Sequence, residues 1–209
     1  IKEIERIAIL RNKQVQIGIR LNPNTDAKTL RQISTGKKEN KFGVNEKTFL
    51  DLVKKYKRSK NEILKCLSVH IGSQILDHEP YEKMLKVIYK IIKKANFNFE
   101  FIDLGGGMGI QYENNHKKLD YKKYNNSIIR FLKKYNSKII FEPGRSIIGN
   151  TASLISKVIY IKEEKTKNFI VLDAAMNDLI RPALYGAFHK ILFDFLFFFK
   201  PGNILWKAP

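Results

Sequence analysis

The sequence predicts an α/β fold with parallel strands, followed by a β-rich second element. Three observations predict it. Short apolar runs typical of strands are each followed by a longer amphipathic helical pattern, polar residues stand where the strand-like runs end, and the pattern changes to strand-like runs after about residue 145. With 209 residues and 44% apolar side chains, the chain is long enough to bury a core.

Each unit of the alternating pattern begins with a strand-like run. In residues 15–22, apolar side chains alternate with polar ones or glycine, as expected of a strand with one buried face. Similar runs occupy residues 66–72, 99–105 and 138–144. Four such units amount to half of a (β/α)8 barrel.

Helical patterns separate the strand-like runs. They cover residues 49–56, 81–95 and 128–135, and Pro80 stands where a helix tolerates proline, in its first turn. Residues 1–10 also have a helical pattern, with Ile1, Ile4 and Ala8 on one side.

Polar residues fall at the carboxyl ends of the strand-like runs. They are Arg20, His70, Asp103 and Glu142, and His70 is expected one residue before its strand ends. Barrels and doubly wound open sheets both bind ligands at this edge, so the position leaves the two folds open.

The second element begins at about residue 145. Residues 153–161 and 168–176 are strand-like and are joined by a charged turn. From residue 190 onward, an apolar run and a tail punctuated by proline and glycine fit neither a clean strand nor an amphipathic helix.

The charge balance, 39 Lys and Arg against 20 Asp and Glu, gives a formal net charge of +19. The lysines are spread along the chain, and zinc-ligand spacing and aromatic platform motifs are absent from the sequence, so we expect neither nucleic-acid binding nor a metal site. A single cysteine makes no internal disulfide, and no apolar stretch approaches the roughly 20 residues that span a bilayer. We therefore expect a cytoplasmic protein without membrane binding.

Two motifs follow strand-like runs and contain several glycines. In DLGGGMG, residues 103–109, consecutive glycines let backbone N–H groups surround a phosphate, although a tight turn has the same composition. In FEPGRS, Glu142 precedes Pro143, Gly144 and Arg145, which suits either an anion site or a Glu–Arg ion pair that holds the loop.

Two further motifs carry candidate binding side chains. SVHIGSQ places His70 beside Ser73 in a turn, where the histidine is either catalytic or an ordinary core or surface residue. NDLIRPALY places Arg181 and Tyr185 one helical turn apart, able to converge on one anionic group, although surface residues have the same spacing.

Together and in this order, SVHIGSQI, DLGGGMGIQY, FEPGRSIIGNTASLISKV and VLDAAMNDLIRPALYGAFHKI resemble the diaminopimelate decarboxylase family over residues 1 to about 191. The resemblance implies a pyridoxal-phosphate enzyme with an alanine-racemase-like (β/α)8 barrel, a following β-domain and a homodimeric assembly. Residues 1–144 would then be the C-terminal half of the TIM barrel, 145–191 the start of the β-domain and 192–209 a divergent tail.

The resemblance also assigns roles to the candidate residues. His70 would stack on the pyridine ring and Glu142 would pair with its nitrogen, while Arg20 would lie near the cofactor. The cofactor phosphate and the loop around it would involve Ser73, Gly105, Gly106, Gly107, Pro143, Gly144 and Arg145. Arg145, Arg181 and Tyr185 would contact the substrate.

The implied reaction converts meso-2,6-diaminopimelate to L-lysine and CO2. A relative acting on ornithine, arginine or carboxynorspermidine is one alternative, and a remnant that keeps the fold without chemistry is another. The family's Schiff-base lysine lies in a segment resembling YAxKAN, and its site is completed by a segment resembling CESxD; neither occurs in the sequence. We therefore expect the chain to be a fragment, inactive by itself, with a tail that reflects a frameshift, truncation or gene decay.

Overall fold

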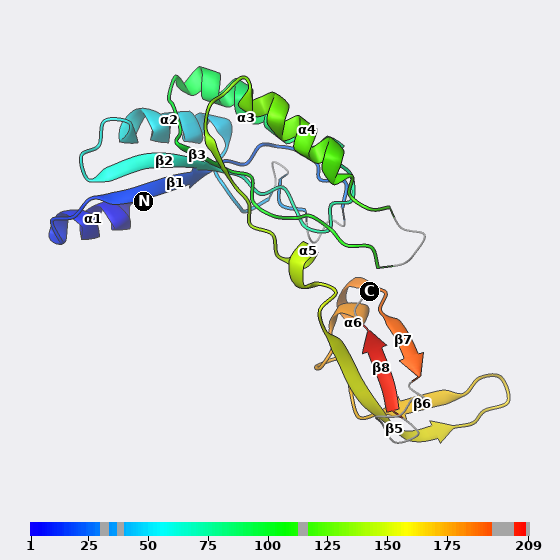
Figure 1. Ribbon diagram of the computed structural model, residues 1–209. Coiled ribbons are helices and arrows are strands. Elements are labelled where there is room, and N and C mark those ends of the chain that lie inside the picture. The colour runs from blue at the N-terminus through cyan, green and yellow to red at the C-terminus, as the bar shows by residue number, and fades with distance from the viewer. Residues whose placement is uncertain (30–33, 37–39, 113–116, 194–202, 208–209) are drawn as a thin grey trace. The chain divides into compact units, whose positions relative to one another are not determined.

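The computed structural model describes residues 1–29, 34–36, 40–112, 117–193 and 203–207 (Figure 1). The chain forms two compact units. The parallel-sheet unit comprises residues 1–109 and 118–145, and the antiparallel unit comprises residues 110–117 and 146–209.

The first unit is built on a four-stranded parallel sheet. Its strands are β1 (Val15–Arg20), β2 (Glu62–Ser68), β3 (Phe101–Asp103) and β4 (Lys138–Ile140), and their order in the sheet is their order in the sequence. A doubly wound sheet reverses its order at a switch point, whereas a barrel proceeds in one direction. The predicted α/β fold is confirmed, and the strand order is that of a partial barrel.

Three helices lie along one face of this sheet (Figure 1). They are α2 (Glu46–Tyr56), α3 (Glu79–Ala95) and α4 (Tyr121–Leu132). The Asn45 and Asp120 side chains accept hydrogen bonds from the backbone N–H of Thr48 and Lys123, which caps the starts of α2 and α4. A left-handed Asn96 ends α3.

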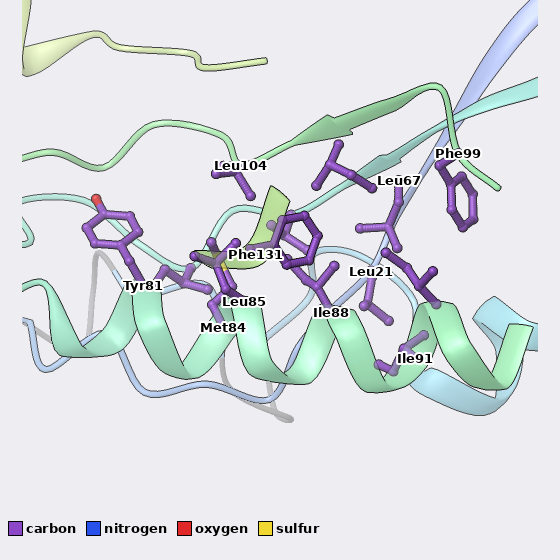
Figure 2. Close-up of a cluster of buried hydrophobic side chains, with 14 of the residues drawn as sticks. Leu21, Leu67, Tyr81, Met84, Leu85, Ile88, Ile91, Phe99, Leu104 and Phe131 are labelled. Atoms are coloured by element: carbon purple, nitrogen blue, oxygen red, sulfur yellow. The ribbon is translucent and has the colours of Figure 1, made fainter. Parts of the chain in front are cut away.

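The core forms between the helices and the sheet. Figure 2 shows side chains of α3, among them Met84 and Ile88, pointing towards strand residues such as Leu67. On β1 the alternate residues Ile17 and Ile19 are buried in the same core, so the period-two pattern of the sequence is borne out.

The pairing of the strands aligns their carboxyl ends. Arg20 pairs with Ser68, Ser68 with Asp103, and Asp103 with Ile140. A β-bulge at Lys65 shifts the register, since Ile17 pairs with Leu64 but Gly18 pairs with Cys66. The polar side chains predicted at strand ends therefore belong to one edge of the sheet.

Several predicted boundaries were wrong. β2 ends at Ser68, so His70 follows its strand by two residues instead of preceding the end, although Val69 N–H still donates to Asp103 O at 2.8 Å. Helix α1 (Lys2–Leu10) forms, but of its predicted apolar face only Ala8 is buried, while Ile1 and Ile4 are exposed.

The antiparallel unit contains a sheet with the strand order β6–β5–β8–β7. Its strands are β5 (Ser153–Lys162), β6 (Phe169–Leu172), β7 (Lys190–Phe193) and β8 (Asn203–Lys207), and its short helix is α6 (Arg181–Tyr185). Helix α5 (Arg145–Ile148) lies at the boundary of the two units in the sequence. The tail differs from expectation, because β8 pairs with both β5 and β7 and so gains its strand hydrogen bonds from distant residues.

Within the described residues, no helix has both the length and the hydropathy needed to cross a bilayer. The described residues also contain no group of three or more His, Cys, Asp or Glu placed to hold a metal ion.

Candidate functional site

The candidate site lies at the carboxyl edge of the parallel sheet, where the loop after β3 packs on the loops after β2 and β4. This glycine loop, residues 104–109, is held on both sides by backbone hydrogen bonds. Glu142 N–H donates to Gly105 O at 2.9 Å, and Ile75 N–H donates to Gly107 O at 2.9 Å. The loops that carry the motifs SVHIGSQ, DLGGGMG and FEPGRS are therefore joined by backbone hydrogen bonds.

Glycine is required in this loop for steric reasons. A Cβ on Gly106 would lie 2.2 Å from Glu142 O, and one on Gly107 would lie 2.2 Å from Gly72 O. Gly105 and Gly107 also have φ of +65° and +94°, which side chains disfavour. The glycines allow three backbone segments to approach more closely than any side chain would permit.

Asp103 supports the loop from the end of β3. Its buried carboxylate accepts a hydrogen bond from Ser68 Oγ at 3.0 Å and another from Gly105 N–H at 2.8 Å. Both carboxylate oxygens are thus used within the protein, which makes Asp103 a structural residue of this edge.

His70 is half-buried, and its ring is fixed by the glycine loop. Gly106 N–H donates to His70 Nδ1 at 3.2 Å, so Nδ1 carries no proton and the neutral ring has its proton on Nε2. The backbone carbonyl of His70 accepts hydrogen bonds from Thr35 Oγ1 at 3.0 Å and from Arg20 at 3.4 Å. Burial, with the Arg20 charge as a second cause, lowers the pKa of His70, so the ring is neutral at pH 7.

Glu142 and Arg145 lie on the loop after β4. Glu142 is exposed, and its backbone carries the contacts with the glycine loop, while Arg145 donates from Nη1 to Gln74 Oε1 at 3.2 Å. The ion pairs among the described residues do not include a Glu142–Arg145 pair, so the structure does not support the alternative of a loop held by that pair.

The remaining residues of this edge are Ser73, Pro143 and Gly144. Ser73 is half-buried in the turn after β2, and Pro143 and Gly144 are exposed. A Cβ on Gly144 would have no atom within 4 Å, so this glycine leaves open space beside the loop. The backbone N–H groups of Gly107 and Gly144 make no hydrogen bond within the described part of the chain.

Arg181 and Tyr185 belong to the antiparallel unit. They are the first and last residues of α6, one helical turn apart as the sequence predicts. The Arg181 guanidinium contacts Tyr112 and His189, and Tyr185 is exposed.

Sequence reasoning missed other residues that support the site. Gln74 orients Arg145, Thr35 contacts the His70 carbonyl, and Tyr81 Oη donates to Gly106 O at 3.3 Å from within α3. Tyr81 occupies an apolar helix position, so its pattern indicated only a core residue. The positive φ of Gln74, +58°, has no signature in the sequence.

Cys66 lies two residues before Ser68 on β2. Burial raises the pKa of its thiol to about 11, with the charges of Asp103 and Glu142 as smaller contributions in the same direction. The thiol is therefore protonated at pH 7 and is a poor nucleophile.

The chain is similar to a known protein family and to individual members of it. Residues 1–149 match the family model described as the pyridoxal-binding domain of pyridoxal-dependent decarboxylase. The diaminopimelate decarboxylase of Zymomonas mobilis is 41% identical over 195 residues, covering 91% of this chain and 46% of that protein. A Helicobacter pylori diaminopimelate decarboxylase is 43% identical over 196 residues, covering 91% of this chain and 48% of that protein.

The crystal structure of Helicobacter pylori diaminopimelate decarboxylase complexed with L-lysine is also similar, with a TM-score of 0.88 and 36% identity. The match covers 99% of this chain and 59% of that one. The chain thus spans about half the length of the curated relatives it matches. Since the family model covers most of the sequence and includes the whole glycine-loop edge, this chain belongs to the family of pyridoxal-dependent decarboxylases.

Proposed function

We propose that the chain forms part of a diaminopimelate decarboxylase, which converts meso-diaminopimelate to L-lysine and CO2 with pyridoxal 5'-phosphate. The observation that carries the proposal is the glycine loop, clamped between the His70 and Glu142 segments with N–H donors still unused. The names of the similar proteins, diaminopimelate decarboxylases from two bacteria, support this substrate.

The residues present suit the cofactor. Phosphate would be bound by backbone N–H groups of the glycine loop and of Gly144, with the hydroxyl of Ser73 and the guanidinium of Arg145 nearby in the same set of loops. A neutral His70, fixed by Gly106 N–H, offers a flat ring for stacking on pyridine.

The cofactor, when bound, supplies an electron sink for the electron pair that decarboxylation leaves on the substrate carbon. The protein would have to keep the pyridine ring protonated, because the protonated ring accepts the electron pair better. The Glu142 carboxylate, facing the pyridine nitrogen, would stabilise the protonated ring by charge and hydrogen bonding. His70 would add no opposing positive charge, because its lowered pKa keeps it neutral.

Substrate recognition would involve cationic and phenolic groups. Diaminopimelate has a second carboxylate at its far end, whereas ornithine and arginine end in a cation there. Arg145, Arg181 and Tyr185 are our candidates for binding the substrate, with Arg181 the best suited to the second carboxylate. We further propose that residues 1–144 are a partial barrel, 145–191 the start of the β-domain and 192–209 a divergent tail, and that the complete enzyme is a cytoplasmic homodimer.

Cofactor binding can be tested on the chain itself. Pyridoxal phosphate would react with many of its lysines, so the probe is 4'-deoxypyridoxine 5'-phosphate, which lacks the aldehyde. Calorimetric titration should show saturable binding of this analogue and at least about tenfold weaker binding of unphosphorylated 4'-deoxypyridoxine. Equal affinity for the two compounds would contradict phosphate recognition by the glycine loop.

Activity can be tested in a chimaera in which residues 1–191 replace the matching segment of the Helicobacter pylori relative. Release of CO2 should be faster from meso-diaminopimelate than from ornithine or arginine. Faster release from either of the other two would overturn the substrate assignment, and a chimaera that binds the analogue but releases no CO2 would favour a catalytically dead remnant. The chain alone, supplied with pyridoxal phosphate, is expected to release none.

A further inference from the structure

Arg181 lies in a cluster with Tyr112 and His189, and the sequence did not predict these contacts. Its Nη1 donates to Tyr112 Oη at 2.8 Å and lies 3.4 Å from His189 Nε2. The guanidinium carbon is 5.0 Å from the centre of the Tyr112 ring. The rings of Tyr112 and His189 meet edge to face, 5.9 Å apart at 79°. All three residues belong to the antiparallel unit.

These contacts involve Nη1 of the guanidinium and leave its Nε–Nη2 edge available for binding. Nη1 has two N–H groups, one directed to Tyr112 and one to His189, whereas Nε and Nη2 hold three more donors. Arg181 is half-buried, and within the described residues it has no carboxylate at ion-pair distance and no other hydrogen-bond partner. The Nε–Nη2 edge has the geometry that binds a carboxylate through two parallel hydrogen bonds.

The two partners also fix the plane of the group. Two acceptors on Nη1 prevent the guanidinium from turning about its Nε–Cζ axis, and the adjacent Tyr112 ring restricts its tilt. An arginine held in this way loses less conformational entropy when it binds an anion.

We propose that Tyr112 and His189 are positioning residues, which orient Arg181 so that its Nε–Nη2 edge binds a carboxylate of the substrate side-on. The identity of that carboxylate rests on the function proposed above, whereas the orientation of Arg181 does not.

His189 makes the arrangement sensitive to pH. Arginine only donates, so His189 must accept with an unprotonated Nε2. The charged and titratable groups that face His189 among the described residues are Arg181 and Tyr112. Burial, followed by the charge of Arg181, lowers the pKa of His189. Protonation at low pH would remove the acceptor and place two positive groups side by side.

The orientation can be tested without a ligand, by ¹H–¹⁵N NMR of the arginine side chains of the whole chain. Restricted rotation should give Arg181 resolved Nη–H signals at low temperature. Tyr112→Phe keeps the ring but removes the acceptor, and His189→Phe removes the second acceptor, so each should merge these signals. His189→Gln can still accept through Oε1 and should retain them. Signals that stay resolved in both phenylalanine variants would overturn the proposal.

Binding experiments distinguish the orienting role of Tyr112 and His189 from the identity of the substrate. Titration of the chain with meso-diaminopimelate and with glutarate, a plain dicarboxylate, should shift the Arg181 Nε–H signal. Loss of one acceptor should weaken binding about three- to tenfold, the range of one hydrogen bond. The affinity of the wild-type chain should fall as pH decreases through the lowered pKa of His189, and His189→Gln should abolish this dependence.

The outcomes are distinct. A response to glutarate but not to diaminopimelate, with the expected variant effects, would support the orienting role and reject the substrate proposed above. Binding of diaminopimelate that is unaffected by Tyr112→Phe and His189→Phe would reject the orienting role and leave the proposed function intact. A pH dependence that persists in His189→Gln would also contradict the role of His189.

Discussion

At the scale of single residues, some polar side chains at the carboxyl edge of the parallel sheet are used in hydrogen bonds that stabilise the loops, and others are exposed. Both carboxylate oxygens of Asp103 accept hydrogen bonds, from Ser68 and from Gly105, so Asp103 stabilises the glycine loop. Glu142 contributes its backbone to the same loop and keeps its carboxylate exposed. The carboxylates of these two acidic residues at strand ends therefore differ in burial: that of Asp103 is held within the protein, and that of Glu142 is exposed.

His70 should make the stability of the parallel-sheet unit depend on pH. Its pKa is lowered by burial and by Arg20, so near pH 6 the unfolded chain binds more protons than the folded one. The free energy of unfolding should therefore decrease as pH falls below about 6.5, the ordinary histidine value, and level off below the pKa of the folded state.

Urea unfolding followed by helical circular dichroism measures this, because α2, α3 and α4 belong to that unit. His70→Gln should reduce the slope between pH 7 and 5. His189→Gln, in the other unit, is the matched control and should leave the slope unchanged. The same slope in wild type and His70→Gln would show that other groups cause it.

Glu142→Gln in the chimaera should retain the cofactor but slow the reaction. A neutral amide no longer favours the protonated pyridine ring, and a loss of about 10²-fold in kcat, or roughly 2.7 kcal/mol, is typical of one electrostatic contact. Cofactor absorbance and CO2 release measure the two quantities separately. Unchanged kcat would assign Glu142 a structural role only.

At the scale of elements, helix α3 contacts the glycine loop through the side chain of Tyr81. Tyr81, buried on α3, donates to Gly106 O, and its ring packs 4.4 Å from that of Tyr124 on α4. The Tyr124 hydroxyl is buried without a hydrogen-bond partner in the described structure. Tyr124 also meets Phe141, the residue before Glu142, edge to face at 6.3 Å. These aromatic contacts connect the two helices to the loops that form the site.

Tyr81→Phe and Tyr124→Phe form a matched pair. Both remove one buried hydroxyl and keep the ring, but only the first removes a hydrogen bond. Tyr81→Phe should lower the free energy of unfolding by about 0.5–1.5 kcal/mol, whereas Tyr124→Phe should leave it unchanged or raise it, because the lost group has no partner. Urea midpoints measure both. Equal destabilisation by the two changes would exclude a contribution from the Tyr81–Gly106 bond.

Gly106→Ala and Gly144→Ala test the packing of the two loops. The first places a Cβ 2.2 Å from Glu142 O and must displace one backbone segment, and the second enters open space. We expect Gly106→Ala to lower stability by about 1–3 kcal/mol and to weaken binding of the phosphorylated analogue, as overpacking does. Gly144→Ala should change stability by less than about 0.5 kcal/mol. Similar stability of the two variants would mean that the loops are not in contact.

At the scale of the whole molecule, 39 Lys and Arg side chains outnumber 20 Asp and Glu side chains, for a formal net charge of +19. Ion pairs such as Arg6–Glu3 and Lys94–Glu46 are exposed, and pairs of this kind contribute little to stability. Mutual repulsion among the excess lysines therefore dominates the long-range electrostatics.

Added salt should accordingly stabilise the chain. Raising NaCl from about 0.02 to 0.3 M shortens the screening length from roughly 20 Å to below 10 Å and weakens repulsion that unfolding relieves. The urea midpoint at pH 7 should rise over this range, and KCl should have the same effect. A midpoint that falls with salt would mean that local ion pairs outweigh the net charge.

The sequence by itself determined the α/β class, the positions of most helices and strands, and the polar residues that follow the strands of the parallel sheet. These depend on neighbours in the chain: alternation buries Ile17 and Ile19, and a 3.6-residue period buries Met84 and Ile88. It also placed the glycine and proline motifs at strand ends, because turn chemistry is local.

Tertiary structure alone decided which of these residues meet. Glu142 contacts Gly105 across 37 positions, Arg181 contacts Tyr112 across 69, and β8 pairs with β5 although its own residues carry no clear strand pattern. No local period encodes such pairings. They follow from the register of the sheets and the packing of the whole chain, and that is why the contacts of Arg181 with Tyr112 and His189 have no signature in the sequence.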